Sequence, residues 1–308
     1  MKNILIHSPE YGALADKLAQ QLSYEQGELE LKTFPDGERY MRIITDVRDC
    51  DVFLLGAAHS DTASLQTFDL ACGLVEAGAK RLTLILPYFG YSTMERGVKA
   101  GEIVTAKNRA RLYSAIPKAP YGNRIFLLDL HAEGIPHYFE GNTFVFHLYA
   151  KPVIISGAKS LGGTDFVLGS TDSGRAKWVE SLANDMGVQA AFIYKKRLSA
   201  TETKVTAVNA HVKGQHVIIY DDMIRTGGSL IGAAKAYMDA GALRLSVVTT
   251  HGIFPGNAIE RLKSSQLITQ VLCTDSHPNA VKQAQNHPEF LTILGIEKLL
   301  TQAIKHRR

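Results

Sequence analysis

The chain has 308 residues and a mass of 33.7 kDa, which exceeds the usual size of one domain and therefore predicts two. Apolar residues make up 45% and charged residues 21%, and no apolar run reaches the roughly 18 residues that a membrane-spanning helix needs. The net charge of +4 is too small and too scattered for a nucleic-acid-binding surface. Because the first residues lack the pattern of a signal peptide, we expect a cytoplasmic protein that binds neither nucleic acid nor a membrane.

Three cysteines, Cys50, Cys72 and Cys273, are widely spaced along the chain. Their number is odd and they form no CxxC pair, so the sequence supports neither a disulfide framework nor a cysteine zinc site. We expect all three to be small apolar residues of the core.

Short apolar runs rich in β-branched residues alternate with helix-period segments along most of the chain. This pattern is typical of βα units wound into parallel sheets, so the sequence predicts an α/β protein. The expected strands are 3–7, 52–56, 82–86, 125–128, 166–169, 216–220 and 245–249, with a further strand-like run at 153–156. Apolar residues three and four positions apart predict helices around 68–75 and 230–238, each followed by an Ala-Gly pair suited to a left-handed cap.

Two nearly identical phrases indicate an internal duplication. Residues 76–84 are Glu-Ala-Gly-Ala-Lys-Arg-Leu-Thr-Leu, and residues 239–247 are Asp-Ala-Gly-Ala-Leu-Arg-Leu-Ser-Val. Each phrase places a capping glycine directly before a predicted strand, so we expect two similar α/β domains. The alternative is convergence on a common helix-to-strand connection. We place the domains at residues 1–150 and 151–308.

The strand expected at 216–220 runs into the segment 221–229, Asp-Asp-Met-Ile-Arg-Thr-Gly-Gly-Ser, which should open the following helix. Gly227 and Gly228 allow a tight turn that points backbone N–H groups at one spot, beside the positive end of the helix dipole. Thr226 and Ser229 add hydroxyl donors for the same anion. The segment therefore predicts a phosphate site, and the alternative is a glycine-rich turn without a ligand.

Two acidic residues, Asp221 and Asp222, begin this segment. Carboxylates repel phosphate, but an adjacent pair accepts hydrogen bonds from the vicinal hydroxyls of a ribose or holds Mg²⁺. Ligands of open α/β sheets bind at the carboxyl ends of strands, where this pair is expected. A ribose 5-phosphate, with a sugar at one end and a phosphate at the other, fits the order of these residues.

The segment 221–229 resembles the ribose-binding loop of type I phosphoribosyltransferases and of ribose-phosphate diphosphokinases, the phosphoribosyl pyrophosphate synthetases. Further motifs favour a divergent member of the second family. They are 34–38 (similar to its FPDGE loop), 87–91 (PYFGY), 129–131 (DLH), 170–174 (SPDxG) and 250–251 (TH). The resemblance covers about residues 30 to 280 and implies two similar phosphoribosyltransferase-like domains, each a mainly parallel sheet flanked by helices.

The resemblance also implies which residues bind ATP. Phe34, Asp36 and Glu38 form a loop that is expected to hold ATP and to reach a neighbouring subunit's site. An aromatic ring there suits stacking on a purine, and the two acids suit hydrogen bonds from an amine or ribose hydroxyls. Arg96 and His131 are expected to contact ATP as well. An ordinary Pro-Asp-Gly turn is the alternative for the loop.

The remaining expected ligands contact the metal and the sugar. The resemblance implies that His131 and Asp172 hold Mg²⁺ and that Asp172 also contacts the ribose, whereas helix capping is the alternative for Asp172. The residues expected to bind ribose 5-phosphate are Asp172, Asp221, Asp222, Arg225, Thr226, Gly227, Gly228 and Ser229.

Lys195 and Arg197 match the K-x-R pattern of the family's mobile catalytic loop and are the expected catalytic residues. They follow a strand-like run at 191–194 and precede a polar stretch at 199–204, while Lys196 should point away. Diphosphoryl transfer spreads negative charge over the phosphorus oxygens, so cations that close over the group stabilise the transition state. A solvated run of charges is the alternative.

Three positions depart from the family pattern. Residues 92–96 are Ser-Thr-Met-Glu-Arg where members have Ala-Arg-Gln-Asp-Arg, so Thr93 lacks a cation that helps to hold ATP. Arg225 replaces an acid in the ribose loop, which suits a more anionic acceptor such as ADP-ribose. Residues 97–102 resemble the shorter loop of archaeal-type members more than the bacterial regulatory loop.

The implied reaction is attack of the C1 hydroxyl of ribose 5-phosphate on the β-phosphorus of Mg-ATP, giving 5-phosphoribosyl 1-diphosphate and AMP. ATP and ribose 5-phosphate are the expected partners, and Mg²⁺ is the expected cofactor. The family also implies a homodimer or homohexamer. Two other classes stay open: a type I phosphoribosyltransferase, which releases no AMP, and a non-catalytic regulatory subunit, which Thr93 and Met94 suggest.

Overall fold

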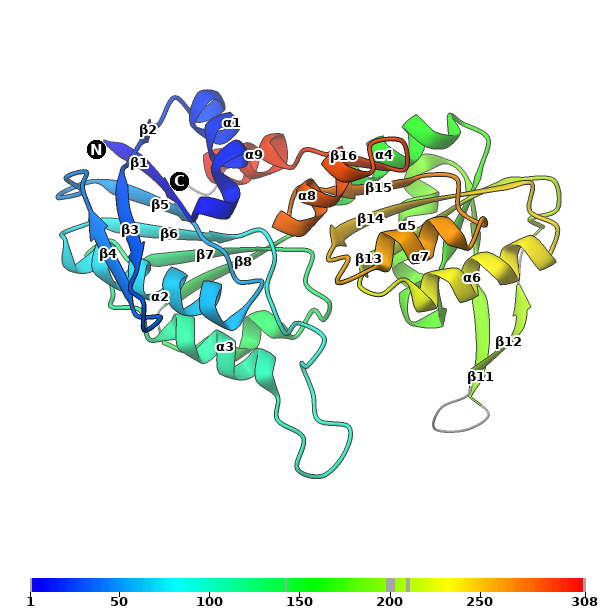
Figure 1. Cartoon of the computed structure of the whole chain (residues 1–308), viewed down its shortest axis with the longest axis horizontal. Coiled ribbons are helices and arrows are strands. Elements are labelled where there is room, and N and C mark those ends of the chain that lie inside the picture. Colours follow the sequence, from blue (N-terminus) through cyan, green and yellow to red (C-terminus); the bar gives the residue numbers. More distant parts are fainter. Residues whose placement is uncertain (1, 142, 198–202, 209–210, 307–308) are drawn as a thin grey trace. The chain divides into compact units, whose positions relative to one another are not determined.

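The computed structural model describes residues 2–141, 143–197, 203–208 and 211–306. The chain forms two compact α/β units, which confirms the expected fold class (Figure 1). The first unit runs through Tyr149 and takes in the C-terminal helix from Glu297, and the second unit is Ala150–Ile296. No helix in the described ranges is both long enough and apolar enough to cross a membrane.

The first unit contains a six-stranded parallel sheet in the order β2-β1-β5-β6-β7-β8. Its strands are β1 (Asn3–His7), β2 (Glu25–Gln26), β5 (Asp51–Leu55), β6 (Arg81–Leu86), β7 (Asn123–Leu128) and β8 (Thr143–Leu148). Its helices are α1 (Gly12–Leu22), α2 (Asp61–Glu76), α3 (Thr105–Ser114) and α9 (Glu297–His306). Figure 1 shows α2 and α3 on one side of this sheet and α1 and α9 on the other.

The second unit contains a parallel sheet in the order β10-β9-β13-β14-β15-β16. Its strands are β9 (Val167–Ser170), β10 (Gln189–Ala191), β13 (His216–Ile224), β14 (Arg244–Gly252), β15 (Val271–Thr274) and β16 (Leu291–Leu294). Its helices are α4 (Lys151–Gly162), α5 (Ala176–Met186), α6 (Gly228–Asp239), α7 (Ala258–Ser264) and α8 (Pro278–Asn286).

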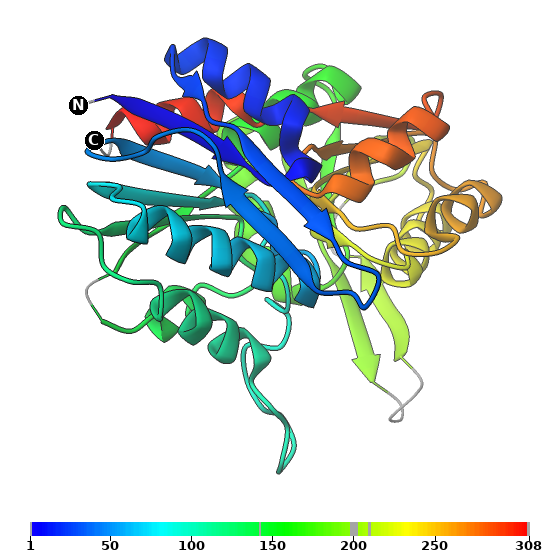
Figure 2. The same ribbon diagram turned by 60° about the vertical axis from the view of Figure 1, so that its left-hand side comes forward.

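The two units share one topology, because the two strand orders correspond element by element. In each unit an antiparallel hairpin follows the second strand of the sheet in sequence. The hairpins are β3 (Leu29–Thr33) with β4 (Arg39–Ile43), and β11 (Ile193–Arg197) with β12 (Thr203–Val208). Figure 2 shows the β11–β12 hairpin extending away from its sheet. This correspondence supports an internal duplication.

The repeated phrases make the same contact in both units. Gly78 follows α2 with a φ of 97°, and Gly241 follows α6 with a φ of 92°, a region of backbone space that favours glycine. The Gly78 carbonyl accepts a hydrogen bond from the Asp49 N–H at 3.0 Å, and the Gly241 carbonyl accepts one from the Gly214 N–H at 2.8 Å. In each unit, the residues after the helix are therefore hydrogen-bonded to the loop that precedes a central strand. That strand is β5 for the segment after α2 and β13 for the segment after α6.

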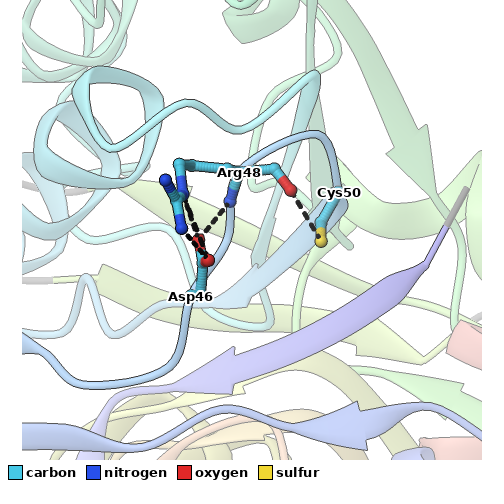
Figure 3. Close-up of polar contacts among 3 residues, drawn as sticks. All are labelled: Asp46, Arg48 and Cys50. Atoms are coloured by element: carbon cyan, nitrogen blue, oxygen red, sulfur yellow. Dashed lines mark hydrogen bonds and ion pairs between the residues drawn. The ribbon is translucent and has the colours of Figure 1, made fainter.

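The loop that meets Gly78 is held by local polar contacts (Figure 3). The Arg48 guanidinium donates to both carboxylate oxygens of Asp46, with Nε 2.9 Å from Oδ1, and this lowers the pKa of Asp46 to about 2. The Cys50 thiol donates to the Arg48 carbonyl at 3.3 Å. Cys50 and Cys273 are buried, Cys72 is partly buried, and all are free thiols.

Two expected strand assignments are wrong. The apolar run 153–156 lies in α4, where Pro152 occupies the first turn, a position in which proline favours a helix. The strand expected to end at Tyr220 continues through Ile224 as β13, because β14 continues beside it and pairs Asp221 with Thr249 and Ile224 with Gly252. The acidic pair therefore lies inside a strand.

The C-terminal helix α9 belongs to the first unit, whereas we expected residues 151–308 to form the second domain. Helix α9 packs against α1, where the Thr301 hydroxyl donates to Gln21 Oε1 at 3.0 Å and the Leu300 and Ile304 side chains are buried. The other end of the expected boundary, at 150/151, is one residue from the division between the units.

Candidate active site

The residues expected to bind the sugar phosphate are brought to one edge of the second sheet. Strands β9 and β13 are parallel neighbours, and Tyr220 pairs with Ser170 near the end of β9. The segment 171–174 follows β9, and the segment 225–227 joins β13 to α6. Carboxyl ends of parallel strands are where α/β proteins bind ligands, so this edge is the candidate sugar-phosphate site.

The acidic pair of this edge is tied into the protein by hydrogen bonds. Asp221 Oδ2 accepts a hydrogen bond from the Thr171 hydroxyl at 2.9 Å, and Asp221 Oδ1 accepts one from the Asp222 N–H at 3.0 Å. Asp222 is only 3% exposed and forms an ion pair with Arg175. Sequence reasoning missed Arg175, although it stands directly after the motif 170–174.

The electrostatics of the pair favour an added cation or hydroxyl donor. Burial of its carboxyl group and the neighbouring Asp222 raise the pKa of Asp221 well above its ordinary value, and Thr171 and Arg175 only partly oppose this. Further positive charge or hydroxyl groups placed against the pair would stabilise the ionised form of Asp221. The donor set therefore fits ribose hydroxyls or Mg²⁺.

Asp172 lies in the turn between β9 and α5, where its Oδ1 accepts a hydrogen bond from the Gly174 N–H at 2.9 Å. This bond gives Asp172 a structural role at the turn. His131 lies in the other unit, and the described residues contain no group of three or more His, Cys, Asp or Glu side chains arranged to hold a metal ion. Mg²⁺ commonly binds through one or two carboxylates together with substrate phosphates, and single ligands such as Asp172 fit that mode.

The loop before α6 has the open geometry of an anion site. Gly227 has a φ of 77° and precedes the first helical residue, Gly228, and no side chain in the described part of the chain caps the helix. Arg225, Thr226 and Ser229 are exposed beside it. Backbone N–H groups of the first helical turn and the positive end of the helix dipole are therefore available to a phosphate.

The corresponding helix of the first unit differs at this point. Helix α2 begins after Ser60, whose Oγ accepts a hydrogen bond from the Ala63 N–H at 3.2 Å. Of the two corresponding helices, α2 is thus capped at its start by the Ser60 side chain, whereas α6 has no side-chain cap among the described residues.

Lys195 and Arg197 lie within strand β11, not in a loop after a strand. The backbone of Lys195 pairs with Val205 and that of Arg197 with Thr203, and the pairing register shifts between Tyr194 and Lys195. Residues 198–202, part of the expected polar stretch, lie outside the described residues. The expected strand-like run 191–194 spans the end of β10 and the start of β11.

Tyr237 links the end of β10, the strand before the β11–β12 hairpin, to the end of β9. Its side chain projects from α6 and is fully buried, and its hydroxyl lies 2.9 Å from the Ser170 carbonyl and 3.0 Å from the Ala191 carbonyl. One O–H proton is shared between two acceptors. Tyr237 therefore fixes the segments that lead to Asp172 and to Lys195, a role that sequence reasoning missed.

The expected ATP loop of the first unit forms the turn of the β3–β4 hairpin. The Phe34 N–H donates to the Glu38 carbonyl at 2.8 Å, the Gly37 N–H donates to the Phe34 carbonyl at 2.9 Å, and Asp36 Oδ1 accepts from the Glu38 N–H at 3.1 Å. The backbone is thus closed on itself, and the side chains of Asp36 and Glu38 are exposed. Phe34 is 48% exposed, so its ring is accessible for stacking.

The segment after β6 contains a polar cluster against the start of α2. The Tyr91 hydroxyl donates to Asp61 Oδ1 at 2.8 Å, and Arg109 pairs with the same carboxylate while its guanidinium lies 5.0 Å from the centre of the Tyr91 ring. Sequence reasoning missed Arg109, which places a cation next to the motif that lacks one at Thr93. Arg96 lies further along, 3.4 Å from Glu95 Oε1, and its side chain is 78% exposed.

His131 follows the end of β7 in a loop whose backbone is tightly held. Asp129 is buried and has a φ of 38°, which is unusual for a residue with a side chain. The Leu130 N–H donates to His147 Nε2 at 2.9 Å, and His147 Nδ1 lies 3.3 Å from Glu133 Oε2. Burial lowers the pKa of His147, with Glu133 opposing.

Comparison with protein families identifies both halves of the chain. Residues 4–116 match the family model described as the N-terminal domain of ribose phosphate pyrophosphokinase. Residues 172–308 match the phosphoribosyl synthetase-associated domain. The candidate sugar-phosphate edge lies in the second of these ranges, and the expected ATP loop lies in the first.

Individual relatives resemble the chain over nearly its whole length. It is 34% identical to a ribose-phosphate pyrophosphokinase of Rhodopirellula baltica over 95% of this chain and 91% of the relative, and 31% identical to one of Vibrio parahaemolyticus over the same shares. A crystal structure of phosphoribosylpyrophosphate synthetase from Mycobacterium smegmatis matches with a TM-score of 0.87 at 29% identity, covering 99% of this chain and 98% of the other. The chain therefore belongs to the ribose-phosphate pyrophosphokinase family.

Proposed function

We propose that this protein transfers the β,γ-diphosphoryl group of ATP to the C1 hydroxyl of ribose 5-phosphate, which forms 5-phosphoribosyl 1-diphosphate and releases AMP. Family membership supports this activity. The observation that carries it is the pairing, at one sheet edge, of an uncapped helix start at Gly227–Gly228 with the carboxylates of Asp221 and Asp222. Such an edge offers positive charge to a phosphate and acceptors to sugar hydroxyls.

In this proposal the sugar is held at both ends. The 5′-phosphate binds the loop of Arg225, Thr226, Gly227, Gly228 and Ser229, whose exposed donors and helix start face solvent. The acidic pair at 221–222 and Asp172 accept hydrogen bonds from the ribose hydroxyls. Fixing both ends orients the C1 hydroxyl, and such positioning supplies a large share of the acceleration in phosphoryl transfer.

ATP is bound by residues of the first unit in this proposal. Phe34 stacks on the purine, Asp36 and Glu38 accept from its polar groups, and Arg96 and His131 contact the nucleotide. His131 and Asp172 are the proposed contacts of Mg²⁺, which would neutralise negative charge on the diphosphoryl group. The raised pKa of Asp221 shows that its ionised form is disfavoured in the folded protein. A nearby cation such as Mg²⁺ would stabilise that ionised form, which supports the proposal.

Lys195 and Arg197 are the proposed catalytic residues, because the transferred group gains negative charge on its oxygens in the transition state. Their place in β11, part of a hairpin that extends from the sheet, supports a role in closing over the substrates (Figure 1). The proposed assembly is a homodimer or homohexamer, in which the exposed Phe34 hairpin serves a neighbouring subunit's ATP site.

The test measures AMP release from ATP with ribose 5-phosphate, with ribose and with ADP-ribose as acceptors. We expect AMP release with ribose 5-phosphate and none with ribose, which lacks the phosphate. AMP release with ADP-ribose but not with ribose 5-phosphate would show that the acceptor is a larger derivative of ribose 5-phosphate. The exposed Arg225 favours such an acceptor. Conversion of a base and phosphoribosyl diphosphate to a nucleotide, without AMP from ATP, would instead indicate a phosphoribosyltransferase.

Two variants test the catalytic assignment. Lys195→Ala should lower the rate about 10²–10³-fold, the usual effect of losing one donor to a developing oxyanion. Lys196→Ala removes the same charge from the neighbouring position and should retain nearly full activity. Loss of activity in both variants to the same degree would contradict a specific role for Lys195. Absence of AMP release by the wild-type chain with every acceptor would indicate a non-catalytic subunit.

A further inference from the structure

The start of α6 contains a glycine that packing does not require. Gly228 is the first residue of the helix, and a methyl group added to it would meet its nearest neighbours at 3.7 and 4.0 Å, which is ordinary van der Waals contact. Gly227 is different, because its φ of 77° would strain any side chain and because an added methyl group would lie 2.7 Å from Leu262, which would have to move. Glycine destabilises a helix relative to alanine. The missing side chain at Gly228 therefore keeps open a space that the chain itself does not fill.

The two atoms nearest to this space are both hydrogen-bond donors. Arg261 Nη2 lies 3.7 Å and Thr226 Oγ1 lies 4.0 Å from the position that a Gly228 methyl group would occupy. Thr226 belongs to the loop before α6, whereas Arg261 comes from α7. The neighbouring Leu262 is buried against Gly227, which fixes α7 beside the loop and keeps Arg261 at this point.

The charge at this point is unbalanced. The start of α6 has no side-chain cap and carries the positive end of the helix dipole, and Arg261 adds a full positive charge next to it. Among the described parts of the chain, no carboxylate forms an ion pair with the exposed Arg261 guanidinium. A cation beside a positive helix end is unfavourable by itself, and an anion placed between the two reverses the sign of the interaction.

We infer that Arg261 binds the phosphate monoester of the sugar substrate, in the space over Gly228 that it shares with Thr226. The inference rests on the proposed function, which makes 225–229 the phosphate loop, and it adds a cation from a separate helix. A guanidinium matches phosphate oxygens well because it donates two parallel hydrogen bonds. Arg261 thereby determines recognition of the phosphate and takes no part in the transfer itself.

Steady-state kinetics of the full chain test this role through the variants Arg261→Gln and Arg261→Lys. Arg261→Gln should raise the KM for ribose 5-phosphate about tenfold, as loss of a charged hydrogen bond predicts. The KM for ATP and kcat should stay within about twofold of wild type, because binding that is equal in ground and transition states affects KM alone. The KM of Arg261→Lys for ribose 5-phosphate should lie between those of wild type and Arg261→Gln. Lys263→Ala is the matched control, since it removes a charge from the same helix where Lys263 pairs with Glu289.

A second measurement uses inorganic phosphate and no substrate. Phosphate should raise the Tm of the wild-type protein and of Lys263→Ala, and should raise that of Arg261→Gln much less. Without phosphate, the Tm of Arg261→Gln should equal or exceed that of wild type, because an unfavourable charge is removed. Gly228→Ala should likewise raise the Tm without phosphate and weaken the phosphate response.

Two results would overturn the role of Arg261. One is a wild-type KM and a wild-type phosphate response in Arg261→Gln. The other is an equal change in Arg261→Gln and Lys263→Ala, which would indicate a general effect of net charge. Failure of the proposed function is a separate result, namely no AMP release by the wild-type chain with ribose 5-phosphate, and the phosphate response still decides the role of Arg261 in that case.

Discussion

The Leu130 N–H donates a hydrogen bond to Nε2 of His147 at 2.9 Å and thereby ties the loop that carries His131 to the end of β8. Because Nε2 is the acceptor, the neutral imidazole carries its proton on Nδ1, which faces Glu133 Oε2 at 3.3 Å. The Tyr149 hydroxyl donates to the same Glu133 oxygen at 2.7 Å. His147 is thus held from one side while it holds Leu130 on the other.

Replacement of His147 by leucine should therefore disturb His131 without removing it. The variant leaves the Leu130 N–H without its acceptor, which costs about 1–3 kcal/mol of stability, and frees the loop. We expect a higher KM for ATP and little change in the KM for ribose 5-phosphate. His147→Gln keeps an acceptor at a similar reach and should restore most of the ATP affinity. An unchanged KM for ATP in His147→Leu would show that the loop does not need this bond.

Asp221 should make stability depend on pH. Its raised pKa means that, from the ordinary value of 3.8 upward, the folded chain holds a proton that the unfolded chain has lost. The free energy of unfolding therefore falls as pH rises through this window. Asp221→Asn removes this dependence and should be more stable than wild type at alkaline pH, although its catalytic activity should fall.

The neighbouring Asp222→Asn should instead be less stable than wild type, because it removes the buried carboxylate that pairs with the Arg175 guanidinium. Urea denaturation of both variants and of wild type at acidic and alkaline pH gives the comparison. If the difference between Asp221→Asn and wild type is the same at both pH values, the carboxyl group of Asp221 is not the source of the pH dependence.

Tyr237→Phe should show how the hydroxyl of Tyr237 supports the site. The change leaves the carbonyls of Ser170 and Ala191 without this buried donor and should lower the free energy of unfolding by about 1–3 kcal/mol. Because Ala191 leads into the strand of Lys195, kcat should fall as well. Urea denaturation and steady-state kinetics measure the two effects, and a fall in stability with an unchanged kcat would limit Tyr237 to a structural role.

The sequence predicted several central strands and two helices, but it misjudged where one strand ends and which class one apolar run belongs to. The strand before the phosphate loop was expected to stop at Tyr220 because two acids follow, but pairing with β14 carries the strand to Ile224. Residues 153–156 had the composition of a strand, yet they lie in α4 after Pro152. Short apolar runs do not distinguish buried strands from buried helices, so tertiary pairing decides such cases.

The site residues divide in a similar way. Motif residues such as Asp221 and Thr226 could be proposed from the sequence because they are contiguous in it. Arg175 and His147 were missed because each contacts a residue far away in sequence, Asp222 and Leu130 respectively. Arg261, the proposed phosphate ligand, was missed for the same reason, since it lies beside Gly228 only in the fold. Helix α9 was assigned to the wrong unit for the same reason, since its contact with α1 joins the two ends of the chain.

The proposed exchange of ATP loops between subunits predicts complementation. Phe34→Ala and Lys195→Ala should each be nearly inactive, one in the loop given to the neighbour and the other in the catalytic hairpin. Mixed and re-equilibrated, they should recover about a quarter of the wild-type sites, as random pairing in a two-fold dimer requires. Recovery is measured as AMP release. A mixture no more active than its components would show that both residues serve the same subunit.

The most direct test of the proposed function is a phosphorus NMR analysis of the complete reaction of the wild-type chain with Mg²⁺, ATP and ribose 5-phosphate. We predict that AMP and a diphosphate ester at C1 of the sugar appear in equal amounts, with the 5′-phosphate unchanged, because the β,γ-diphosphoryl group moves as one unit. Accumulation of ADP with a sugar bisphosphate, or no consumption of ATP, would contradict the account.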